Sequence, residues 1–133
     1  MQNRFLGRLP LVSLACLSLL GNAAYAEIAL SIAGTYGDPS GCNFKMKGNF
    51  TTDSGTYLSS NVFGGYEWSC EFVWAHEAAG SEIGAYDNSQ VWSVIALCAA
   101  EGEAFSQLLS IQKFNDTVTV SGGGDQSVLK LCE

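Results

Sequence analysis

Basic side chains, histidine and long apolar segments are all scarce in this chain of 133 residues. Each shortage excludes some classes of function. Six lysines and arginines stand against 13 acidic residues, and His76 is the only histidine. A chain this acidic repels nucleic acid and anionic membranes. A single histidine and the lack of a Cys-x-x-Cys pair argue against a zinc site. No serine lies in the Gly-x-Ser-x-Gly motif that presents a nucleophile in hydrolases. We also expect no cofactor.

The first 26 residues have the composition of a secretory signal peptide. Arg4 and Arg8 precede an apolar run from Leu11 to Gly21, and Ala24-Tyr25-Ala26 has small residues at both flanking positions of a cleavage site. The apolar run is shorter than the about 20 residues that cross a bilayer. We therefore expect cleavage after Ala26. Residues 27–133 would then form a single periplasmic or extracellular domain that is not held in a membrane.

Cys16 leaves one alternative, in which a lipoprotein is cut just before a lipid-modified cysteine. Only Leu11 to Ala15 would then form the apolar segment, which is too short. Ser13 also replaces the aliphatic residue that is usual three places before such a cysteine. The cleavage site after Ala26 is therefore favoured.

Cleavage would also change the charge balance, because both arginines leave with the signal. Four lysines then remain against 13 acidic residues, a net charge of −9. Such a charge keeps an exported protein soluble, and it would also attract a basic protein partner.

Four cysteines remain after the expected cleavage. Cysteines in small exported domains serve as cross-links, so we expect two disulfides. Four cysteines allow three pairings, and closure of the shorter loops favours Cys42 with Cys70 and Cys98 with Cys132.

Short apolar segments separated by glycine and aspartate predict an all-β domain. Residues 105–114 fit a strand, or a helix that follows the acidic residues Glu101 and Glu103, and the β-rich surroundings favour the strand. The pattern indicates a small antiparallel barrel or sandwich of seven to eight strands, stabilised by disulfides. We expect turns at residues 37–41, 64–65, 115–116 and 122–125. The other expected strands cover residues 32–36, 44–50, 56–58, 66–74, 91–99, 117–120 and 128–132.

An aromatic stripe is the most informative pattern in the chain. Strict alternation places five side chains on one face of a single strand: Tyr66, Trp68, Cys70, Phe72 and Trp74. We predict that this face is structural core, as in a small filled barrel. The alternative is a face that carries a small apolar ligand.

Two constellations could suggest catalysis, and neither is convincing. His76 and Glu77 are adjacent on a strand, so their side chains should point to opposite faces. Glu101 and Glu103 would ionise independently in an exposed loop rather than act as the paired carboxylates of a glycosidase. We therefore expect a protein that is not an enzyme.

Binding is instead expected on the exposed loop of residues 78–88, with Glu82, Tyr86 and Asp87 as candidate residues. The predicted function is that of a protein-interaction or inhibitor module with a basic protein partner. The alternative function is a carrier of small apolar ligands that uses the aromatic face.

Two short segments resemble known families of β-barrels. Gly34-Thr35-Tyr36 resembles the Gly-x-Trp opening of lipocalins. Ser54-Gly55-Thr56-Tyr57 is similar to the Ser-Gly-x-x-Tyr element of bacterial periplasmic lysozyme inhibitors, with the tyrosine one place earlier. The Trp-rich, lysine-bearing second motif of the inhibitors is absent. The chain is assigned to neither family.

Overall fold

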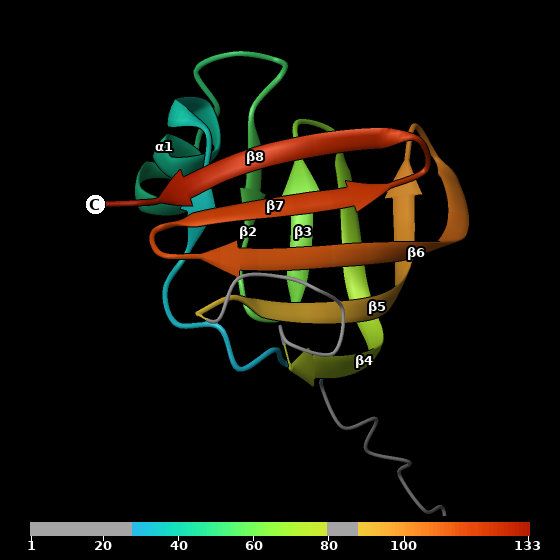
Figure 1. Ribbon diagram of the computed structural model, residues 1–133. Coiled ribbons are helices and arrows are strands. Elements are labelled where there is room, and N and C mark those ends of the chain that lie inside the picture. Colours follow the sequence, from blue (N-terminus) through green and yellow to red (C-terminus); the bar gives the residue numbers. More distant parts are fainter. Residues whose placement is uncertain (1–27, 80–87) are drawn as a thin grey trace, which may run out of the picture.

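The computed structural model describes residues 28–79 and 88–133, which form a closed antiparallel barrel of eight strands (Figure 1). Each strand pairs with the next one along the chain, and β1 closes the barrel by pairing with β8. The all-β fold class is thereby confirmed as a barrel. The strands are β1 (Tyr36–Gly37), β2 (Thr56–Leu58), β3 (Val62–Gly65), β4 (Trp68–Ala79), β5 (Gln90–Ala100), β6 (Glu103–Phe114), β7 (Thr117–Gly122) and β8 (Asp125–Leu131).

Two groups of strands cross each other around the core. Figure 1 shows β2, β3 and the first part of β4 running across the direction of β6, β7 and β8, while β4 and β5 bend from one direction to the other. Large apolar side chains fill the space between the two groups. Among those with the smallest exposed fractions are Tyr36, Leu58, Trp92, Val94, Leu109, Ile111, Val118, Val120 and Leu129.

Four of the connections between strands are two-residue turns, at residues 66–67, 101–102, 115–116 and 123–124. Such turns need residues that tolerate a positive φ, and Gly123 and Gly124 have φ of 62° and 91°. The expected turns at residues 115–116 and 122–125 are confirmed. The expected break at residues 64–65 is wrong, because both glycines belong to β3 and the chain turns just after them.

The helix α1 (Pro39–Lys47) contradicts the turn expected at residues 37–41 and the strand expected at residues 44–50. The Asp38 side chain accepts a hydrogen bond from the Gly41 N–H at 2.7 Å and so caps the helix, while Pro39 occupies its first turn. Gly48 ends the helix with φ of 82°. The alternation of apolar and polar residues in this segment was therefore a coincidence of composition.

The aromatic stripe on β4 is split, because a β-bulge lies between Phe72 and Trp74. Cys70 and Phe72 are buried in the core, with exposed fractions of 2% and 5%. The extra residue at the bulge turns Trp74 to the outside, where its exposed fraction is 47%. Tyr66 lies in the preceding turn and is also exposed. The prediction of one continuous core face is therefore wrong at both of its ends.

Both expected disulfides form, but with a different pairing. Cys70 and Cys98 face each other directly across β4 and β5. Cys42 on α1 bonds to Cys132, which directly follows β8. The favoured pairing of neighbouring cysteines is wrong, because strand order in the barrel, rather than loop length, decides which cysteines meet.

The remaining strand predictions hold with changes in length. Residues 105–114 are a strand, and so are 56–58, 91–99 and 117–120. The first strand is reduced to Tyr36–Gly37, and β8 ends at Leu131. From Trp92 to Cys98, the strand β5 buries alternate side chains, so this part of the strand is covered on one face. Within the described residues, no helix is long and apolar enough to span a membrane.

Candidate functional site

The residues expected to bind a partner belong to the segment between β4 and β5. Glu82, Tyr86 and Asp87 lie outside the described residues, as does the expected cleavage site after Ala26. The strand β4 extends to Ala79, so the first two residues of the expected loop belong to a strand instead. The candidate site lies in another part of the barrel.

The side chains of His76 and Glu77 have different partners, as expected for adjacent residues on a strand. His76 points outward and stacks on Trp74, with ring centroids 6.2 Å apart. Glu77 instead accepts hydrogen bonds from Ser31 Oγ and Gln90 Nε2. The carboxylate therefore orients neither ring nitrogen of the histidine.

A groove of about 540 Å³ opens at the end of the barrel where β3 turns into β4 and β5 turns into β6. Its walls come from α1, the segment that follows it, β2, the two turns and the ends of β3, β4 and β5 beside these turns. We call it the aromatic rim groove, because five of its lining residues are aromatic: Phe44, Phe50, Tyr57, Tyr66 and Trp68.

The helix and the following segment position two of these rings. Phe44 on α1 stacks on Phe50, with centroids 4.3 Å apart and planes 3° from parallel. Ser40 Oγ accepts hydrogen bonds from the backbone N–H groups of Thr51 and Thr52, at 2.8 and 2.9 Å. The buried serine thereby ties the segment that carries Phe50 to the start of the helix.

Close approach at glycines sets the position of the rest of the aromatic wall. A Cβ atom on Gly65 would lie 2.2 Å from Trp68 Nε1, so the indole can lie here only against a glycine. Gly41 lets α1 approach β2 closely, because an added Cβ would lie 1.9 Å from the carbonyl oxygen of Thr56.

Burial raises the pKa of the Tyr57 phenol, which therefore stays protonated at neutral pH.

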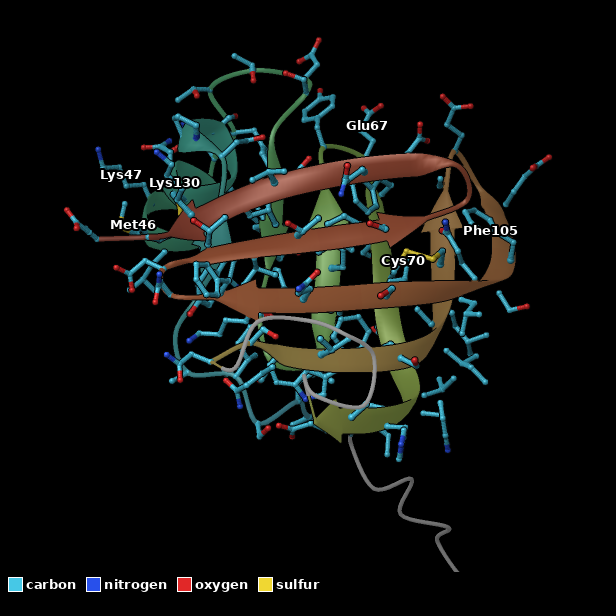
Figure 2. All side chains as sticks on the ribbon, viewed as in Figure 1. Met46, Lys47, Glu67, Cys70, Phe105 and Lys130 are labelled. Carbon is cyan, nitrogen blue, oxygen red and sulfur yellow. A yellow bond between two sulfur atoms is a disulfide. The ribbon has the colours of Figure 1, made fainter. Side chains whose placement is uncertain are left out.

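Two glutamates edge the groove from neighbouring turns. Glu67 and Glu101 both line it, and the pairing of Trp68 with Ala100 brings their turns together. Figure 2 shows the Glu67 side chain pointing away from the barrel at this rim. Neither carboxylate forms an ion pair with any residue in 28–79 or 88–133. The groove therefore combines apolar rings with negative charge.

Both glutamates adopt a backbone conformation that side chains other than glycine rarely take. The φ of Glu67 is 61° and that of Glu101 is 51°. A non-glycine residue in this region costs about 1–3 kcal/mol unless its surroundings compensate, and such residues gather at functional sites. Glu103, in contrast, is the first residue of β6 and does not line the groove. Glu101 and Glu103 thus do not act on the groove as a pair.

The described residues contain no cluster of three or more His, Cys, Asp or Glu side chains that could hold a metal ion. No family model, curated protein or solved structure matches the chain.

Sequence reasoning missed the aromatic rim groove because its aromatic residues come from separate segments. The sequence pattern predicts Phe44 and Phe50 on one strand, and Tyr66 and Trp68 on a core face of another. The Asp38-Pro39 pair was the available signal for a helix start, because aspartate caps helices and proline suits their first turn. Recognition of that helix would have separated Phe44 from the expected strand.

Proposed function

We propose that this protein is a non-catalytic protein-interaction or inhibitor module that binds a basic segment of a partner protein in the aromatic rim groove. The observation that carries the proposal is the combination of five aromatic rings with two carboxylates in one groove. Aromatic faces attract cations, and carboxylates bind lysine or arginine side chains by charge-assisted hydrogen bonds. An expected mature net charge of −9 would attract the same partner from a distance.

One of these rings already has a cation over it, which comes from the protein itself. Lys45 Nζ lies 5.0 Å from the centroid of the Tyr57 ring, within the range of a cation–π contact. The lysine belongs to the same chain and is not among the residues that line the groove. The open side of the groove presents Tyr66, whose exposed fraction is 41%, to a partner.

The alternative, a carrier of small apolar ligands, has less support. It depended on the Tyr66–Trp74 face, and the bulge divides that face between the core and the outer surface. The two glutamates at the rim would also oppose the entry of an uncharged apolar molecule, because their charge favours water.

The binding of short synthetic peptides to the purified protein tests the proposal. Peptides that differ only in a central arginine, lysine, glutamine or glutamate are titrated while Trp fluorescence or heat is recorded. We expect the arginine and lysine peptides to bind, and their affinity to fall as salt is added. The double change Glu67→Gln and Glu101→Gln should weaken binding by about tenfold, or about 1.4 kcal/mol.

A matched pair of charges outside the groove provides the control. Glu71→Gln and Asp125→Gln remove the same number of charges from exposed positions on β4 and β8. Affinity should then stay within about twofold, because distant exposed charges are screened by salt. Equal binding of the glutamate peptide, or full affinity in the Glu67 and Glu101 double variant, would refute the proposal.

A further inference from the structure

The outer face of β4, β5 and β6 carries exposed apolar side chains next to one another. Trp74 pairs with Ile95, and Ile95 pairs with Leu108, so the three residues form a row across the three strands. Leu97 lies two residues after Ile95 on the same face of β5, and the bulge places Val73 outside next to Trp74. We call these five residues the outer apolar patch. Their exposed fractions run from 41% for Ile95 to 67% for Leu108.

The outer apolar patch is large for a surface that faces only water. Side chains in register on neighbouring strands lie about 4.5–5.5 Å apart, so the row is continuous. A large side chain presents about 150–250 Å², so five half-exposed ones together present roughly 500 Å² of apolar surface. Patches above a few hundred Å² mark interaction sites on soluble proteins. None of the five residues lines the aromatic rim groove, so the patch is a separate surface.

Polar side chains border the outer apolar patch on the same face. In register with Leu97, or with the position two residues before Ile95, they are Glu71, Ser106, Ser93, His76 and Ser110. Glu71 is the one acidic residue among them. An apolar centre with a polar border is the usual anatomy of a protein interface. The scarcity of charge favours an apolar partner surface over the basic segment that we assign to the groove.

We propose that the outer apolar patch is the interface of a homodimer, in which a second copy of this chain covers it with the same patch. Two-fold dimers need a self-complementary surface. A two-fold axis that runs along β5 places β4 of one copy against β6 of the other. Trp74 of each copy then packs on Leu108 of the other, while Ile95 and Leu97 meet their own counterparts.

The same arrangement keeps the carboxylates of the two copies apart. Glu71 of one copy faces Ser106 of the other, and His76 faces Ser110. The copies can therefore approach without like charges at the contact, although each has an expected mature net charge of −9. The two patches together bury roughly 1,000 Å², which is the lower limit for a specific interface, and the polar border adds to this area. We therefore expect a dimer that dissociates in the micromolar range.

Sedimentation velocity of the purified protein over a range of concentrations tests the interface. We expect the protein to pass from monomer to dimer as the concentration rises. Leu108→Asp should raise the dissociation constant of the dimer by at least about tenfold, because it buries an unpaired charge against Trp74. Val128→Asp is the matched control, because Val128 is similarly exposed, at 62%, and lies on β8 outside the patch. It should change the dissociation constant by less than about twofold.

A mixture of two variants tests which residues meet across the two-fold axis. Leu108→Asp and Trp74→Lys should each be monomeric alone and should form a heterodimer when mixed. At one end of that interface the introduced carboxylate faces the introduced ammonium group, and at the other end Trp74 still packs on Leu108. Thermal melts of the separate variants verify that both are folded, since both positions are exposed.

Three results would overturn the proposal. The first is a wild-type protein that stays monomeric up to about 1 mM. The second is an equal loss of dimer in Leu108→Asp and Val128→Asp, and the third is a mixture of the two interface variants that stays monomeric. A monomeric protein that binds phosphatidylcholine vesicles, and loses this binding in Leu108→Asp, would assign the patch to a membrane surface instead.

Discussion

At the scale of single residues, Glu67 is a position where the proposed binding and the stability of the fold favour different side chains. Its φ of 61° suits glycine, and its carboxylate edges the aromatic rim groove. Asn115 has a similar φ of 54° in the turn between β6 and β7, at the other end of β6 from the groove. The two positions therefore share a backbone conformation but differ in their distance from the proposed site.

Glu67→Gly should stabilise the protein by about 1 kcal/mol, because glycine adopts a positive φ without strain. A thermal melt should then show an increase of about 4–8 °C. The same change should weaken the binding of the arginine peptide, which Asn115→Gly should leave intact while it stabilises the fold by less, since asparagine already tolerates this conformation. A Glu67→Gly protein that melts below the wild type would contradict the assignment of strain.

At the scale of elements, the Asp38 side chain fixes the start of the helix α1. Asp38 Oδ1 accepts from the Gly41 N–H, and Oδ2 accepts from the Thr56 N–H at 2.9 Å. The same carboxylate thus caps the helix and joins it to β2, and α1 carries Phe44 into the groove. Loss of Asp38 should affect both the fold and the binding of a partner.

We predict that Asp38→Ala lowers the free energy of unfolding by about 2 kcal/mol, at the upper end for an N-cap because two backbone donors lose their acceptor. Urea denaturation of the variant measures this loss. Asp53→Ala removes an exposed aspartate from the neighbouring turn and should change stability by less than about 0.5 kcal/mol. Similar losses in the two variants would show that Asp38 acts only through its charge.

The bulge in β4 places Phe72 in the core and Trp74 on the outer surface, so the two residues should contribute differently to stability. Phe72→Ala should cost about 3–5 kcal/mol, because it leaves a cavity in the core. Trp74→Ala should cost less than about 1 kcal/mol, because the bulge turns that side chain outward. Denaturation curves of the two variants distinguish the register with the bulge from strict alternation, which would give both residues a large effect.

At the scale of the whole molecule, the two disulfides stabilise the barrel in different ways. The bond between Cys70 and Cys98 joins adjacent strands and closes 28 residues. The bond between Cys42 and Cys132 closes 90 residues and attaches α1 to the end of the chain. Because β1 and β8 also pair, this bond reinforces the closure of the barrel.

Peptide mapping without reduction should recover Cys42 linked to Cys132 and Cys70 linked to Cys98. Replacement of Cys42 and Cys132 by alanine should cost about 4.6 kcal/mol in the chain-entropy model, against about 3.6 kcal/mol for the shorter loop. The loss of packing by the buried Cys70 and Cys98 adds to the second value. A recovered peptide that links Cys42 to Cys70 would contradict the pairing described here.

The sequence by itself determined the features that depend on local chemistry. Alternation and glycine-rich turns identified most of the strands, and the cysteine count of a short chain predicted two disulfides. The Asn115-Asp116 and Gly123-Gly124 turns could be predicted because their residue types tolerate the required φ. These features need no knowledge of distant contacts.

Only the tertiary structure decided the features that join distant segments. Pairing of β4 with β5, and of β1 with β8, set the disulfide partners, and the bulge turned Trp74 out of the core. The aromatic rim groove formed where α1, β2 and two turns met, so no single stretch of sequence contained it. The physical reason is that a local pattern reports which face of a strand is apolar. It does not report which strand lies next to it, or where an extra residue reverses the faces.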